Sequence, residues 1–153
     1  MPHREVPHWT DEQRQRVEDI VDEYRVGLHD ALNELTEEEA RRCLVPSKTT
    51  LLGLVKHATY VEGVWFDQAV TGQSYAEIGI AGTVDGSFAL RKGDTIATVQ
   101  AAYRKRSQTS RSNLAILRSD DIVNGARCTP GLGASAASPP RACATHRPRR
   151  DPP

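Results

Sequence analysis

The sequence is poor in cysteine and has no long apolar run. Its three cysteines, Cys43, Cys128 and Cys143, form no Cys-x-x-Cys pair. This argues against a thiolate metal site, and an odd count without a framework favours a reducing compartment. No run approaches the roughly 18 apolar residues of a membrane span, and no basic-then-apolar signal peptide opens the chain. We therefore expect a soluble, cytoplasmic protein with no membrane partner.

The chain also lacks net charge, because 20 basic residues balance 20 acidic ones. The balance joins two unlike parts: residues 1–125 carry 15 Lys and Arg against 19 Asp and Glu, and residues 126–153 carry five Arg against one Asp. The basic part has no aromatic side chain on which a base could stack. Nucleic acid is therefore not expected as a partner.

Helical and strand periods are both absent at the two ends. Residues 1–9, with two prolines, predict a flexible arm. Residues 126–153 contain six prolines and one large aliphatic residue, Leu132, so they cannot bury enough apolar surface to offset the entropy of ordering. We expect a disordered tail there. A frameshift near residue 125 in a GC-rich coding sequence, or a genuine basic tail, would give this composition.

What the chain does contain is helical periodicity. A capping-box spacing at Thr10 and Gln13 begins a first helix whose apolar residues recur to Leu35. A second capping box, from Thr36 to Glu39, opens a short connecting helix. A third long helix begins at Asp94 or Thr95. Midway along its apolar side lie Ser107 and Ser110, which either allow close helix approach or border a polar pocket.

The central helix, residues 49–72, organises the rest. Gly72 can end it in the left-handed conformation. Its apolar residues cover most of the circumference, with these down the middle: Leu51, Leu54, Ala58, Val61, Trp65 and Ala69. Four residues are predicted to face away: Lys56, Tyr60, Gly63 and Asp67. The loop 72–94 that follows contains five glycines, and it is either a functional or packed segment or a plain crossover.

These elements predict an all-α, up-and-down helix bundle at residues 10–125, with three long helices legible and the fourth missing. A central helix that is apolar on several faces needs that fourth partner. Without it, apolar surface is exposed, and we expect instability or a homo-oligomer formed through the uncovered bundle face.

Several separate motifs carry a family resemblance. They are Leu35–Arg42, Thr50–His57 followed by Val61, Glu62, Trp65 and Phe66, Gly86–Leu90, and Ala101–Arg104. In this order they resemble the uncharacterised branch of the DinB-like superfamily, over about residues 10–125. Mycothiol- or bacillithiol-dependent isomerases and transferases share its fold.

The resemblance implies a four-helix bundle in which three histidines hold a divalent metal such as zinc, nickel or iron. His57 matches the first of these ligands. The other two are expected as a His-x-x-x-His pair on a final apolar helix, which this chain lacks, and His146 in the tail matches nothing. The implied activity is that of a metal-dependent thiol-cofactor transferase or isomerase, incomplete in this chain and inactive in this form.

The residues alone leave alternatives open at this site. A lone histidine beside an apolar stripe, as His57 is, is more often a hydrogen-bonded core residue than a ligand. His29 is predicted to be solvated, and His3 and His8 lie on the arm.

Glu62 could orient the imidazole of His57 or act as a base. Its helical phase diverges from that of His57, however, so a salt bridge to another helix is favoured. Trp65 and Phe66 are predicted as core anchors, with a pocket wall as the lesser interpretation. The alternative function is a non-catalytic bundle that binds a small molecule or a partner helix.

Overall fold

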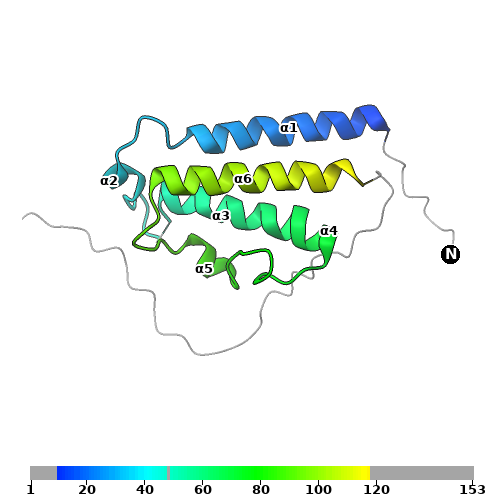
Figure 1. The fold of residues 1–153 in the computed structure, drawn as a ribbon. Coiled ribbons are helices and arrows are strands. Elements are labelled where there is room, and N and C mark those ends of the chain that lie inside the picture. Colours follow the sequence, from blue (N-terminus) through cyan, green and yellow to red (C-terminus); the bar gives the residue numbers. More distant parts are fainter. Residues whose placement is uncertain (1–9, 48, 118–153) are drawn as a thin grey trace, which may run out of the picture.

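Three long helices form the body of the protein (Figure 1). The computed structural model describes residues 10–47 and 49–117. The long helices are α1 (Asp11–Asp30), α3 (Leu51–Gly63) and α6 (Ile96–Ala115). α6 packs against both α1 and α3, and it lies between them in Figure 1.

The prediction of an all-α bundle with three long helices is confirmed. Two short helices, α2 (Glu37–Ala40) and α5 (Val84–Phe88), lie in the connections. The described residues contain neither a strand nor a fourth long helix. The predicted arm, residues 1–9, and the predicted tail, residues 126–153, lie outside the described residues.

Threonine side chains begin the helices. The Thr10 hydroxyl accepts from the backbone N–H of Gln13, whose side chain accepts from the N–H of Thr10, and Thr36 and Glu39 repeat this arrangement. Both predicted capping boxes are therefore confirmed. α1 ends before Leu35, however, because the chain turns at Glu34, which has a left-handed φ of 65°.

The central helix contains one wide turn. α3 continues as a π-helical turn, η1 (Val64–Gln68), and then as α4 (Ala69–Thr71). Gly72, with a φ of 74°, ends the helix as predicted. A π-helical turn holds more residues than an α-helical turn, so it rotates the side chains that follow it relative to a 3.6-residue period. Side chains after Gly63 therefore lie on different faces of the helix from those that a regular 3.6-residue period predicts.

Two residues predicted to face away from the core are buried. Asp67 lies against α6, where it pairs with Arg106. Gly63 lies against the loop that follows the helix, and a Cβ there would come within 2.7 Å of Cγ2 of Ile80. The prediction for both was wrong because α6 and the loop cover this face.

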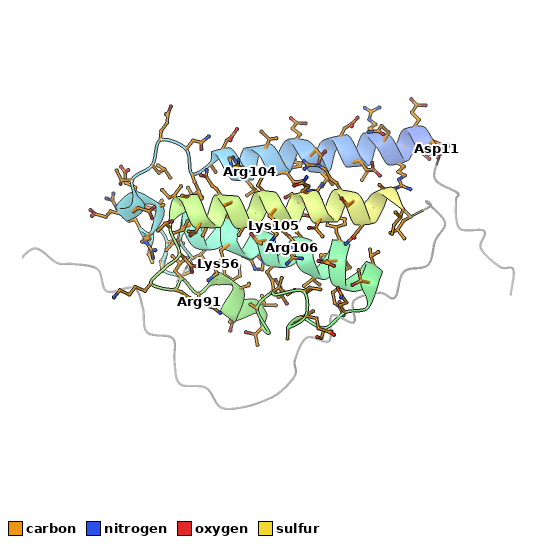
Figure 2. The ribbon with its side chains drawn as sticks, viewed as in Figure 1. Asp11, Lys56, Arg91, Arg104, Lys105 and Arg106 are labelled. Atoms are coloured by element: carbon orange, nitrogen blue, oxygen red, sulfur yellow. The ribbon has the colours of Figure 1, made fainter. Side chains whose placement is uncertain are left out.

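The loop between Gly72 and Asp94 packs on α3. Lys56 lies on the side of α3 away from α1 (Figure 2), where its Nζ donates to the carbonyl of Ala89 at 2.6 Å and to Asp94 at 2.7 Å. α5 lies within this loop and contacts α3. The segment is therefore packed on the bundle, as the first of its two interpretations expected, and is more than a plain crossover.

The core lies where α3 and α6 meet the α1–α2 connection. It consists of Leu32, Ala40, Leu52, Val55, Val99 and Tyr103. Ser107 and Ser110 of α6 are also buried. Ser110 donates to the carbonyl of Arg106 in its own helix, whereas Ser107 borders a cavity, as the second of the two interpretations expected.

One further observation concerns the hydropathy of the helices. Within the described residues, the helices are too short or too polar to span a bilayer.

Candidate functional site

A groove separates α1 from α3, with α6 as its floor. One part, of about 280 Å³, is bordered by Leu28 of α1, by His57 and Val61 of α3, and by Tyr103 of α6. A cavity of about 420 Å³ adjoins it and is bordered by Phe66 and the end of α6. The two parts share Val21 and Arg25, so the groove follows most of the length of α1.

The rims of the groove are apolar and exposed. The exposed apolar side chains that border the groove are Val17 and Tyr24 of α1 and Leu54 and Val61 of α3, and Ile20 and Trp65 are exposed on the same helical segments. Leu54, Val61 and Trp65 were predicted in the middle of the buried arc, but Trp65 is 52% exposed. Helix α6 instead buries the neighbouring face of α3, which contains Leu52 and Val55.

His57 stands at the edge of the groove that lies nearest to α5. Its Nδ1 lies 2.7 Å from the hydroxyl oxygen of Ser87, and its ring stacks on that of Phe88 with a centroid distance of 3.9 Å. Burial lowers the pKa of His57 below its ordinary value. The imidazole is therefore mainly neutral at neutral pH, and Nε2 has no hydrogen-bond partner among the described residues.

Glu62 is paired with α1 and not with His57. Both of its carboxylate oxygens accept from Arg25, at 2.8 and 2.7 Å, and both side chains are buried. The predicted salt bridge to another helix is thus confirmed. The pair continues outward, because Arg25 also donates to Asp22, which accepts from Arg111 of α6. Alternating charges therefore link all three long helices.

The aromatic residues after Glu62 have different environments. Trp65 is 52% exposed, so the prediction that it anchors the core was wrong. Phe66 is partly buried beneath the guanidinium of Arg25, 5.4 Å from its ring centroid, and it borders the larger cavity. The lesser interpretation, a pocket wall, therefore applies to Phe66.

His29 does not contribute to the groove where His57 lies. It is partly buried, with Nδ1 3.0 Å from Asp30 and Nε2 3.0 Å from Arg104 of α6, so it is less solvated than predicted. His3, His8 and His146 lie outside the described residues.

The described residues do not form a complete metal site. They contain no cluster of three or more His, Cys, Asp or Glu side chains that could hold an ion. Glu62 is already paired with Arg25, and the carboxylates of Glu18, Asp19 and Asp22 border the larger cavity and not the part of the groove that contains His57. One imidazole falls short of the three protein ligands that a catalytic zinc site requires. Its assignment as a ligand of zinc, nickel or iron stays a prediction.

The comparison with protein families identifies a relationship over most of the chain. A family model described as mycothiol-S-transferase matches residues 16–145. The match covers nearly all of the described bundle and extends past Gly125, the predicted end of the folded part. Searches of curated proteins and of solved structures found no match.

Proposed function

The chain belongs to the mycothiol-S-transferase family, a DinB-like family, and from this premise we propose that the groove between α1 and α3 corresponds to a thiol-transferase active site. His57 occupies the position of a metal ligand in that active site. The observation that supports this is the placement of His57, whose ring borders the groove with one nitrogen held by Ser87 and the other unpaired among the described residues.

The ligand of this groove is a small thiol cofactor or its conjugate. Apolar side chains such as Leu28, Val61 and Phe66 would hold the non-polar part of a conjugate, and Arg111 lies at the end where the groove is largest. His57 is the one histidine that borders the groove among the described residues, and these residues form no cluster of three side chains that could hold a metal ion. We therefore propose that the described bundle does not by itself catalyse thiol transfer.

The experiment compares metal content and activity in the full chain, His57→Ala and the matched control His29→Ala. Each protein is loaded with Zn²⁺ or Ni²⁺, dialysed and assayed for metal per chain and for conjugation of mycothiol to an electrophile. We expect less than one ion per chain, lower still in His57→Ala alone, and no conjugation. Equal trace metal in all three would remove His57 from the site. One tightly held ion with His57-dependent transfer would overturn the proposed inactivity.

A second candidate function is a non-catalytic bundle whose groove binds a second copy of the chain. The exposed apolar side chains that border the groove favour it, because a symmetric dimer brings the same two helices from each copy together. The charged side chains of the groove are largely paired within the chain, as in Arg14 with Glu18 and Arg25 with Glu62. Two identical faces would therefore meet without strong repulsion.

Sedimentation distinguishes this candidate from a monomer. The wild-type chain is expected to run as a dimer, and Val61→Glu is expected to run as a monomer that binds a hydrophobic dye. Leu44→Glu is the matched control, since Leu44 is 79% exposed but lies away from the groove. A compact monomer that binds no dye would contradict the candidate.

A further inference from the structure

The hydroxyl of Ser87 has two oxygen or nitrogen neighbours but one proton. Its oxygen lies within hydrogen-bond distance of the carbonyl of Val84 and 2.7 Å from Nδ1 of His57. A carbonyl oxygen can only accept, so the Ser87 proton is donated to Val84. The Ser87 oxygen is then left as an acceptor toward His57, and the proton of that hydrogen bond belongs to Nδ1.

This arrangement specifies one tautomer of His57. In a neutral imidazole, one nitrogen carries the proton and the other carries a lone pair. A proton on Nδ1 therefore leaves the lone pair on Nε2. We propose that Ser87 is a positioning residue, which holds His57 in its Nδ1–H tautomer and so presents the Nε2 lone pair to an electron-pair acceptor that enters the groove.

The surroundings keep this pair in place. Ser87 is 1% exposed, and the helix that carries it, α5, begins at Thr83, whose hydroxyl accepts from the backbone N–H of Gly86. Phe88, the next residue, stacks on the His57 ring with an interplanar angle of 13°. One short helix therefore fixes both the proton and the plane of the imidazole.

The inference does not depend on the proposed function. It concerns the metal-free protein and holds whether the acceptor is a metal ion or the acidic proton of a ligand. Only the neutral imidazole has distinct tautomers.

The test is long-range ¹H–¹⁵N correlation NMR on metal-free full chain labelled at histidine, at a pH where the ring is neutral. Comparison with His57→Gln assigns the His57 signals among the five histidines. We expect the pattern of the Nδ1–H tautomer in the wild type, with an upfield Nδ1 and a downfield Nε2. In Ser87→Ala we expect the Nε2–H pattern to become predominant.

Two further variants make the result decisive. Ser110→Ala removes another fully buried serine hydroxyl, one that is bonded within α6, and is expected to leave the His57 tautomer unchanged. Ser87→Thr keeps a hydroxyl and is expected to retain the Nδ1–H form. An Nε2–H pattern in the wild type would overturn the inference even if no variant folds. An unchanged pattern in folded Ser87→Ala would also overturn it.

Discussion

Helix α6 contacts its two long neighbours through different chemistry. Toward α3 it presents Val99 and Tyr103, which pack on the buried Leu52 and Val55. Toward α1 its contacts are largely polar. Arg111 pairs with Asp22, and Gln100 donates to the carbonyl of His29 at 2.8 Å.

The difference shows which contacts supply stability and which supply geometry. Apolar burial contributes free energy roughly in proportion to area, whereas exposed ion pairs contribute about 0–1 kcal/mol each. The α3–α6 contact therefore supplies most of the stability of the described bundle. The α1–α6 contact sets the position of α1 while leaving its apolar stripe at the groove. The exception is the buried pair Arg25–Glu62, which joins α1 directly to α3.

The largest effect is expected from breaking that buried pair. Arg25→Met leaves the Glu62 carboxylate buried without its partner, and we expect a loss of about 3–5 kcal/mol in the free energy of unfolding. The double variant Arg25→Met/Glu62→Leu removes both charges and is expected to recover most of this loss. The free energies of unfolding of the wild type, Arg25→Met, Glu62→Leu and the double variant, measured in urea, form a double-mutant cycle that gives the coupling energy of the pair. A double variant no more stable than Arg25→Met would show that the pair is not the source of the cost.

A loss of about 2–5 kcal/mol is expected for Leu52→Ala, because it leaves a cavity in the α3–α6 contact. The side chain of Leu52 is fully buried. Leu44→Ala removes a leucine of the same size from an exposed site and is expected to change stability by no more than about 0.5 kcal/mol. Equal midpoints for the two variants in urea would remove the distinction between the two contacts of α6.

The smallest effect is expected in the α1–α6 contact. Burial raises the pKa of Asp22, but hydrogen bonds from Arg111 and Arg25 outweigh it, so the pKa lies below its ordinary value of 3.8. A carboxyl whose pKa is lower in the folded state stabilises the protein above its unfolded pKa, and this contribution is lost as the pH falls through the folded pKa.

Asp22→Asn is expected to cost about 0–1 kcal/mol at neutral pH, less in high salt, and to weaken the acid dependence below about pH 4. Thermal unfolding across pH 2–7 measures it, with Asp85→Asn on the exposed surface of α5 as the matched control. If Asp22→Asn lost stability below pH 4 as steeply as the wild type, the lowered pKa of Asp22 would not be the source of this acid dependence.

The sequence predicts well those features that depend on neighbouring residues. The capping boxes at Thr10 and Thr36 and the end at Gly72 follow from local hydrogen bonds and backbone freedom, and all three are present. The helical phase of Glu62, which diverges from that of His57, was enough to predict a salt bridge to another helix. It was not enough to identify Arg25 as the partner.

The features that were missed depend on contacts between distant segments. The environments of Trp65 and Asp67 depend on which segments pack on this helix: α6 covers Asp67, which pairs with Arg106, whereas Trp65 stays 52% exposed. Ser87 meets His57 across 29 intervening residues, which include the rest of α3, η1 and α4, and no spacing rule connects the two. The one signal for Ser87 was its place in the Gly86–Leu90 motif of the family resemblance, to which no role was attached.

The open groove also bears on how the protein responds to temperature. The increase in heat capacity on unfolding depends on the apolar surface that water newly reaches, on average about 12–15 cal/mol/K per residue. The exposed side chains at the groove, such as Tyr24 and Val61, already touch water in the folded state and add little to this increase. We therefore expect the described bundle to have a flatter curve of stability against temperature, and a smaller denaturant m-value, than a closed bundle of equal length.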